Sequence, residues 1–151
     1  MAKKEIHVIC DNIRSLYNVG SIFRTSDALG VSKVWLCGIT GTPEQSGLKK
    51  VALGAEESVA WEHTNQTRHA IAKLKKRGFK IVALELTKDS KNIKLFKPEY
   101  PLALIVGNEV DGVSSALLKH SDAVVHIPMQ GIKESLNVSV AYGIATYELT
   151  K

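Results

Sequence analysis

The residues best suited to chemistry lie in the last third of the chain, in loops that follow two apolar segments. Leu102–Gly107 leads into a loop that contains Glu109, and Ile127 is followed after a few residues by Ser135 and Asn137. Open α/β sheets bind their ligands beyond the carboxyl ends of the strands. If both apolar segments are strands, these polar side chains stand where a binding or catalytic site is expected.

The first of these loops runs from Gly107 to Gly112. The apolar run before it, bounded by Pro101, fits an interior parallel strand, which is covered on both faces and need not alternate. Glycine at each end of the loop permits backbone conformations closed to other residues and lets a ligand come near the main chain. Taken alone, a loop of this composition is more often a turn than a binding site.

The second loop changes that balance. Ser135 can be interpreted as the N-cap of the helix that follows, because serine is among the residues preferred at that position. That interpretation leaves Asn137 unexplained. The alternative is that both side chains take part in binding, because each offers an uncharged donor and acceptor just where a helix begins.

Periodicity along the chain predicts one alternating α/β domain over residues 1–151, with no linker, repeat or low-complexity segment. Apolar runs typical of strands occur at Ile6–Cys10, Lys33–Cys37, Val59–Trp61, Lys80–Leu86, Leu102–Gly107 and Ala123–Ile127. Helices are expected between these strands.

Helical spacing of apolar residues predicts three helices. The first has Phe23 on its apolar face and ends at Gly30. The second covers Thr67–Arg77, and the last runs over about 136–148. The segment Gly38–Gly47 is too polar and too rich in breakers for a regular element, and it predicts a mobile loop.

Composition limits the class of protein. The chain has 151 residues, of which 44% are hydrophobic, enough for one core. No apolar run approaches the roughly 20 residues of a membrane span, and no signal region follows the charged N-terminus, so a cytoplasmic protein is expected. Cys10 and Cys37 have no metal-type spacing and are expected to be buried free thiols. No metal is expected, because the histidines form no close-set pair.

The formal net charge of +5 suggests a polyanionic partner, since clustered Lys and Arg gain affinity for nucleic acid by releasing counterions. The cluster Lys73–Arg77 has a structural explanation, because cations favour a helix C-terminus and Gly78 follows as a stop. A second group, in which lysine recurs every third residue, lacks that explanation. It consists of Lys88, Lys91, Lys94 and Lys97.

The start of the chain excludes a dinucleotide-binding fold. Such a fold places Gly-x-Gly-x-x-Gly directly after its first strand. Here Cys10 leads into Asp-Asn-Ile-Arg at 11–14, which holds no glycine. A nucleotide phosphate loop of that kind is therefore absent from this sequence.

Three segments, in order and in context, closely resemble the signature motifs of the SpoU (TrmH-like) family of RNA ribose methyltransferases, in the SPOUT superfamily. The segments are Asn18–Thr25, Gly107–Gly112 and residues 127–139. The resemblance extends from about Val8 to Leu149, and three ordered motifs are far more specific than any one of them.

The resemblance implies a single-domain, trefoil-knotted parallel sheet flanked by helices, with the carboxyl-terminal segment threaded through an earlier loop. Alternation of strands and helices alone predicts an ordinary open sheet, because knotted folds are rare. Many relatives carry an added amino-terminal RNA-binding domain. We expect no separate RNA-binding domain here, so that the choice of RNA rests on the loops of this domain or on a partner.

The resemblance also implies S-adenosylmethionine as the cofactor, clasped by the loops of the knot. Main-chain groups held by packed loops would recognise its adenine at little cost of organisation. Carried onto this sequence, the cofactor-binding residues are Leu84, Leu86, Gly107, Ile127, Met129, Ser135 and Leu136. For Ile127, Met129 and Leu136 a plain role in the core is the alternative.

By the same resemblance Arg24 is the central catalytic residue for methyl transfer to a ribose 2′-hydroxyl, with Asn18, Glu109, Ser135 and Asn137 around it. A neutral arginine acting as a base would cost roughly 7 kcal/mol near pH 7, because the ordinary pKa of arginine lies above about 12. We favour a protonated guanidinium that grips a neighbouring phosphate and stabilises the developing alkoxide.

Two further expectations concern charged residues. Glu109 is expected to orient Arg24 or Asn18, the alternative being a solvated carboxylate. Arg14, Lys88 and Lys91 are expected to bind RNA. For Arg14, plain exposure to solvent is an equal alternative.

The resemblance implies a homodimer that pairs through the knot region. The last helix offers Leu136, Val140, Ile144 and Tyr147 at helical spacing. Part of that face must pack on its own sheet. The rest is expected to cover a two-fold partner and to build the RNA site between the subunits.

The function that follows is methylation of a ribose 2′-hydroxyl in structured RNA, either tRNA or rRNA. Two alternatives remain. A catalytically silent RNA-binding domain of the same fold would not need the intact Arg24 and Glu109. An α/β enzyme acting on a small nucleotide is disfavoured by the missing phosphate loop and by the basic segment 88–97.

Overall fold

The computed structural model describes residues 4–151, and a seven-stranded sheet forms its centre. The strand order is β3-β2-β1-β6-β4-β7-β5, and every neighbouring pair is parallel. The strands are β1 (Ile6–Asp11), β2 (Lys33–Cys37), β3 (Ala60–Thr64), β4 (Lys80–Leu84), β5 (Lys91–Asn92), β6 (Leu102–Val106) and β7 (Ala123–His126).

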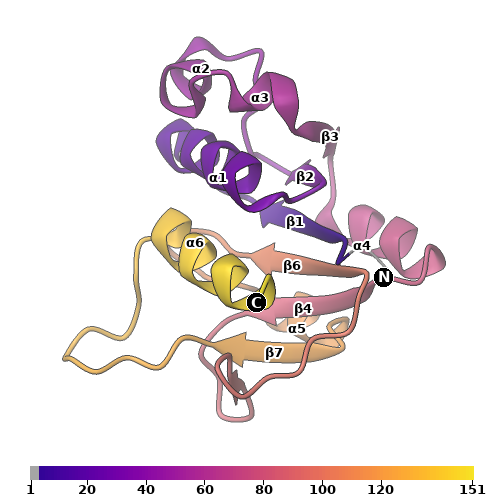
Figure 1. Cartoon of the computed structure of the whole chain (residues 1–151), viewed down its shortest axis with the longest axis vertical. Helices are drawn as coiled ribbons and strands as arrows, with labels where there is room; N and C mark the ends of the chain where they lie inside the picture. Colours follow the sequence, from indigo (N-terminus) through magenta and orange to yellow (C-terminus); the bar gives the residue numbers. More distant parts are fainter. Residues whose placement is uncertain (1–3) are drawn as a thin grey trace.

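Helices cover both faces of the sheet. They are α1 (Leu16–Leu29), α2 (Ser46–Ala52), α3 (Ala55–Ser58), α4 (Thr67–Lys76), α5 (Ser115–Lys119) and α6 (Val138–Leu149). Figure 1 shows α1 and α6 in front of the sheet and α5 behind it. The arrangement is an α/β fold with a covered parallel sheet, as predicted, while the trefoil knot itself stays a prediction.

The central strand β6 shows why the sequence folds this way, because every one of its residues is buried. Leu102, Leu104 and Val106 join the core that contains α1 and α6, whereas Ala103 and Ile105 join the core that contains α4 and α5. Alternate residues therefore enter opposite cores, and a strand covered on both faces needs apolar residues throughout.

The six predicted strands are confirmed, with shifted ends. The largest shift is in β3, expected at Val59–Trp61 and formed by Ala60–Thr64. It is an edge strand that carries Glu62 and His63, so its pattern is not the apolar run of an interior strand. A two-residue strand, β5, lies unpredicted within the lysine-rich segment 88–97.

The ends of the helices depart from prediction in two places. The segment Gly38–Gly47 is not wholly a loop, because α2 begins at Ser46. It is also anchored at Thr40, which is buried and whose hydroxyl accepts a hydrogen bond from the Ile13 N–H at 3.0 Å. The last helix begins at Val138 and not near 136, for a reason that belongs to the site.

The two thiols are buried, as predicted. Cys10 and Cys37 are both free, and burial raises the pKa of each, that of Cys37 to about 12. Both therefore stay protonated at neutral pH. None of the helices in residues 4–151 combines the length and apolarity that a membrane span needs.

Candidate functional site

A cavity of about 810 Å³ lies at the carboxyl edge of the sheet, where the loops after β4, β6 and β7 meet the start of α6. The seven residues expected to bind cofactor all line it: Leu84, Leu86, Gly107, Ile127, Met129, Ser135 and Leu136. They come from parts of the chain up to 52 residues apart in sequence. Their common location follows from the parallel sheet, which brings the strand ends to one edge.

The loop after β6 forms a closely packed wall of this cavity. A Cβ atom at Gly107 would lie 2.3 Å from the carbonyl carbon of Gly112, so no side chain fits there. Gly112 has φ of 67°, a left-handed conformation that glycine adopts without strain. Asn108 closes the turn, because its side-chain oxygen accepts from the N–H groups of Val110 at 2.8 Å and Asp111 at 3.0 Å. The main chain is thus held in place without a ligand.

Glu85 ties this wall to the loop after β4. One carboxylate oxygen accepts from the N–H of Val113 at 3.0 Å, and the other accepts from the N–H of Leu86 at 3.0 Å. Glu85 was not among the site residues predicted from the sequence. Its position directly after a strand and between two apolar residues, Leu84 and Leu86, was the available signal.

Glu109 ties the same wall to the start of α1. Its carboxylate accepts hydrogen bonds from the N–H of Arg14 at 2.8 Å, the N–H of Ser15 at 2.9 Å and the side-chain amide of Asn18 at 3.0 Å. Burial alone would raise the pKa of Glu109, but these donors together lower it. Glu109 is therefore ionised at neutral pH. It bonds to Asn18, and no bond joins it to Arg24 within residues 4–151.

Asn137 extends this network to α6. Its side-chain nitrogen donates to the side-chain oxygen of Asn18 at 3.2 Å. Its side-chain oxygen accepts from the N–H of Ser139 at 2.9 Å, which makes Asn137 the N-cap of α6. Ser135 is therefore not the cap, and α6 begins later than predicted. The network Glu109–Asn18–Asn137 joins the loop after β6 to the first turns of α1 and α6.

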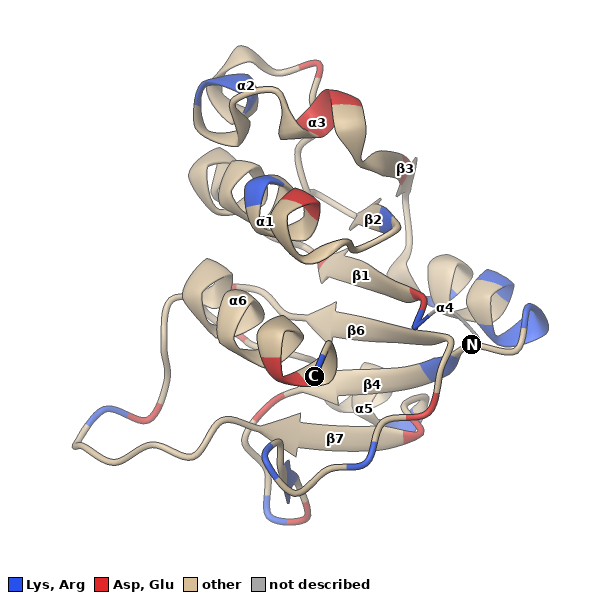
Figure 2. Cartoon of the chain, in the orientation of Figure 1, with Lys and Arg blue, Asp and Glu red and all other residues tan. Residues whose placement is uncertain are grey.

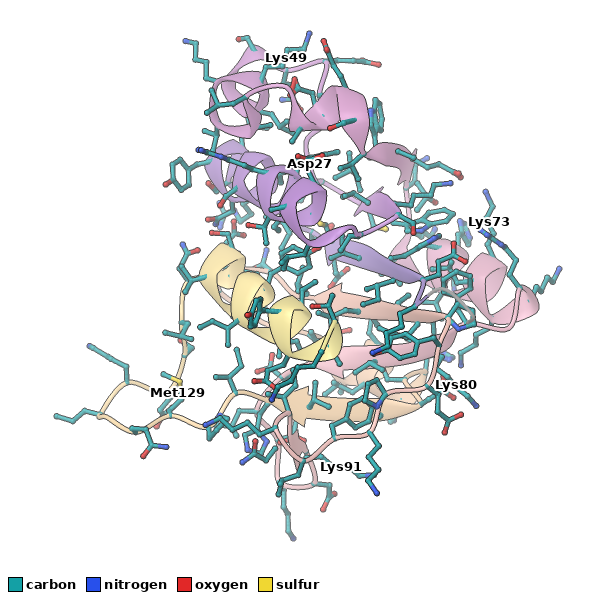
Figure 3. All side chains as sticks on the ribbon, in the orientation of Figure 1. Asp27, Lys49, Lys73, Lys80, Lys91 and Met129 are labelled. Atoms are coloured by element: carbon teal, nitrogen blue, oxygen red, sulfur yellow. The ribbon has the colours of Figure 1, made fainter. Side chains whose placement is uncertain are left out.

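Arg24 and Ser135 lie outside this network. Arg24 is exposed, and among residues 4–151 no hydrogen bond or ion pair holds its guanidinium. Its neighbour Phe23 is buried in the core, as predicted. Ser135 is also exposed and belongs to the segment 128–136, whose residues make no hydrogen bond within the described chain. Figure 3 shows Met129 on this segment, away from the sheet.

The residues expected to bind RNA do not form one cluster. Arg14 lies between β1 and α1, whereas Lys91 lies in β5 at the far edge of the sheet, with Lys88 just before it. Strands β6, β4 and β7 lie between β1 and β5, which separates these positions by roughly 19 Å at the usual strand spacing. All three side chains are exposed.

The basic end of α4 is partly neutralised. Lys73 pairs with Glu62 at 2.9 Å, and Arg77 lies 4.0 Å from Glu5. Glu62 also binds Lys33 at 2.9 Å, and the two lysines lower its pKa. These contacts support the structural explanation for this cluster.

A second hollow, of about 420 Å³, runs between α1 and α6. It is lined by Thr25, Ala28, Leu29, Gly143, Ile144, Tyr147 and Glu148. On α6, Val140, Ile144 and Tyr147 are exposed at spacings of four and three residues. This face of α6 is apolar and uncovered by the described chain.

The chain matches the model of the SpoU rRNA Methylase family over residues 5–147. It is 36% identical over 146 residues to a tRNA (guanosine(18)-2′-O)-methyltransferase of Aquifex aeolicus, and the match covers 97% of this chain and 69% of that protein. It is 32% identical over 152 residues to the 23S rRNA (guanosine-2′-O-)-methyltransferase RlmB of Neisseria meningitidis, and the match covers 98% of this chain and 59% of that protein.

Solved structures give the same result. The A. aeolicus TrmH/SpoU tRNA modifying enzyme superposes with a TM-score of 0.87 at 34% identity, covering 98% of this chain and 75% of that one. An rRNA methyltransferase from Sinorhizobium meliloti, solved with AdoMet bound, superposes with a TM-score of 0.91 at 29% identity, covering 98% of this chain and 56% of that one. By sequence and by structure, this chain belongs to the SpoU rRNA methylase family.

Proposed function

We propose that this chain transfers a methyl group from S-adenosylmethionine to the 2′-hydroxyl of a ribose in structured RNA, either tRNA or rRNA. One observation carries the proposal: the expected cofactor residues line one cavity directly beside the Glu109–Asn18–Asn137 network. The names of the A. aeolicus and N. meningitidis relatives, both guanosine 2′-O-methyltransferases, support the same reaction.

The cavity fits the cofactor. Its volume of about 810 Å³ is within the usual range of small-molecule sites. Leu84, Leu86 and Ile127 offer apolar walls for an adenine ring, and the close-packed turn at Gly107–Gly112 exposes main-chain groups beside them. When bound, S-adenosylmethionine supplies a methyl group already activated by a positively charged sulfur.

The chain's own residues then have to place and activate the ribose hydroxyl. Glu109, Asn18 and Asn137 are satisfied by one another and by main-chain N–H groups, so they position the start of α1. Among the residues that the structure describes, Arg24 has no hydrogen-bond or ion-pair partner for its guanidinium. Its guanidinium binds the phosphate next to the ribose and stabilises the alkoxide as the hydroxyl proton leaves to a phosphate oxygen or water.

Arg24 reaches the reacting atoms from a second subunit in this proposal. Arg24 lies six positions after Asn18, about 9 Å along the helix, and within residues 4–151 no hydrogen bond or ion pair holds it to the cavity of its own subunit. The uncovered apolar face of α6 and the hollow beside α1 suit a two-fold partner. Sedimentation at micromolar concentration should show a dimer, and a species of 16.5 kDa alone would contradict this part.

RNA binds in this proposal through loops of the domain itself. Arg14 is fixed by its N–H bond to Glu109 and holds RNA close to the cavity, while Lys88 and Lys91 hold a more distant part. Contacts to phosphate of this kind position the nucleic acid without reading its sequence. Removal of either lysine should therefore weaken binding of different RNAs to a similar degree.

The direct test is methylation of RNA extracted from cells that lack this protein. The protein is incubated with that RNA and S-adenosylmethionine labelled in the methyl group, and the RNA is then digested to nucleosides. Label in 2′-O-methylated nucleosides is the expected result, with resistance of the same linkages to alkaline cleavage. Label on base atoms would contradict the assigned reaction, and no label with tRNA or rRNA would contradict the enzymatic role.

A further inference from the structure

Tyr17 is an exposed aromatic residue that belongs neither to the Glu109–Asn18–Asn137 network nor to the hydrophobic core. Its exposed fraction is 64%, close to the 65% of Tyr147. Tyr147 belongs to the apolar face of α6, but Tyr17 lies in the first turn of α1. There the neighbouring Leu16 packs against the core, whereas Tyr17 does not. The fold therefore has no evident need for an aromatic ring at this position.

The location of Tyr17 links it to the candidate site. The next residue, Asn18, has its side chain in the network with Glu109 and Asn137. Residues 17, 21 and 24 lie on one face of a helix, so Tyr17 and Arg24 share a face of α1 two turns apart. A group bound at Arg24 would thus have Tyr17 as a neighbour along the helix.

Only positive charges flank the ring along the chain. Between Asp11 and Asp27 the charged residues are Arg14 and Arg24 alone. Both are exposed, and neither guanidinium is held by a bond within residues 4–151. The nearby carboxylate of Glu109 is occupied by main-chain N–H groups and the Asn18 amide.

The helix that packs on α1 adds charge of the same sign. A Cβ atom at Gly20 would lie 2.8 Å from the carbonyl oxygen of Leu48, so α2 crosses α1 in close contact. Lys49 and Lys50 in the last turn of α2 are exposed. Figure 2 shows basic residues on α2, which lies next to α1, and Figure 3 labels Lys49.

We propose that the ring of Tyr17 stacks on an unpaired base of the RNA, next to the ribose that is methylated, while the flanking arginines hold the phosphates on either side. Unpaired RNA bases are recognised in this way, by an aromatic face combined with basic side chains. The inference rests on the proposed function and deepens it, because it requires that the target nucleotide lie in a loop, bulge or end and not within a duplex. Tyr17 is a positioning residue, since it touches a base and not the reacting atoms.

Two substitutions at Tyr17 distinguish an effect of base stacking from an effect of side-chain size. Tyr17→Phe keeps the aromatic face and should leave the KM for RNA near that of the unaltered protein. Tyr17→Leu keeps apolar bulk but removes the face, and should raise that KM at least about tenfold, the scale for loss of one base-aromatic stack. Dissociation constants for S-adenosylmethionine, measured by calorimetry, should be equal in both variants. The matched control is Leu53→Ala, which removes an equally exposed side chain (65%) at the end of α2 and should leave the KM for RNA unchanged.

Ultraviolet cross-linking gives a second readout that needs no kinetics. Protein mixed with tRNA and rRNA from cells that lack it is irradiated, digested with trypsin and nuclease, and analysed by mass spectrometry. The peptide 15–24, which contains Tyr17, should carry an added nucleotide, and this adduct should be lost in Tyr17→Leu.

The outcomes separate this inference from the proposed function. If the unaltered protein methylates ribose but Tyr17→Leu keeps its KM and peptide 15–24 carries no nucleotide, the stacking role is wrong and the enzymatic one stands. If Tyr17→Leu dissociates a dimer in sedimentation, the ring serves subunit contact and the inference is also wrong. If the unaltered protein methylates no RNA, the proposed function itself fails.

Discussion

The two walls of the cavity are built differently. Residues 107–113 form a turn held by Asn108 and by contact between glycines, and Glu85 and Glu109 bind it to neighbouring loops. Residues 128–136 make no hydrogen bond within residues 4–151, and Ile132 among them is 97% exposed. Figure 1 shows this segment running far out from the sheet before it returns to α6.

This difference suggests that the two walls have different roles. The Glu109 carboxylate is hydrogen-bonded within the subunit and fixes the wall formed by residues 107–113 before anything binds, and Asn137 in the same way fixes the start of α6. In the function proposed above, groups that have no partner within residues 4–151, such as Arg24 and the segment 128–136, would gain their partners from ligand, RNA or a second subunit. Changes to the first kind should lower stability, and changes to the second kind should lower activity or binding alone.

The largest expected effect comes from Arg24→Lys. The charge is kept but the forked guanidinium is lost, so methyl transfer to RNA should fall at least about a hundredfold, the usual scale for one preorganised charge-stabilising donor. Because Arg24 has no hydrogen-bond or ion-pair partner within residues 4–151, thermal unfolding and calorimetric affinity for S-adenosylmethionine should be unchanged. Full activity in this variant would mean that Arg24 is not the catalytic residue.

Hydrogen exchange tests the two walls directly. Without ligand, the amides of residues 129–136 should exchange fast and those of 110–113 slowly, because only the latter donate hydrogen bonds. Addition of S-adenosylhomocysteine should slow exchange in 128–136 about tenfold or more. Equal protection of both segments before ligand addition would remove the distinction between them.

Glu109→Gln should weaken the fixed wall. In the unaltered protein the donors use both carboxylate oxygens, but an amide offers only one accepting oxygen. The free energy of unfolding should therefore fall by about 1–2 kcal/mol. The pH dependence of stability tests the same contribution of Glu109. Since the pKa of Glu109 is lowered on folding, its contribution is present above the unfolded value near 4.5 and is lost as the pH falls through the lower, folded value. Denaturant titrations at several pH values should show that loss only when Glu109 is present.

The smallest effect separates the two bonds of Asn137. Asn137→Ala removes the cap of α6 and should cost about 1 kcal/mol of stability. Asn137→Asp keeps the accepting oxygen but removes the donor to Asn18, so it should retain most of that stability. Both variants lose the bond to Asn18, so both should bind S-adenosylmethionine more weakly when measured by calorimetry. Normal affinity in both variants would limit Asn137 to capping.

The residues of this site were more predictable from the sequence than the contacts between them. The strands were predictable, because apolar runs such as Leu102–Gly107 reflect burial on both faces. That the cofactor residues share one edge followed from parallel pairing alone. The contacts of Glu109 with Arg14 and Ser15 were not predictable, because they use main-chain N–H groups, which every residue except proline possesses.

The N-cap of α6 was likewise not predictable from local sequence. Ser135 and Asn137 are both good capping residues, and sequence preference does not choose between them. The choice depends on Asn18, which holds the Asn137 side chain from a different helix. Similarly, β5 has only two residues and forms because β7 offers an edge, so its local sequence carries little signal.

The distance along the chain between bonded partners has a consequence for biosynthesis. Glu109 lies 95 residues from Arg14, and Asn137 lies 119 residues from Asn18. The start of α1 therefore meets all of these partners only after residue 137 has left the ribosome. Contacts this remote slow folding. Until residue 137 has been made, a nascent chain therefore holds the sequence of the first motif without its final support, so synthesis of that motif alone does not give competence for catalysis.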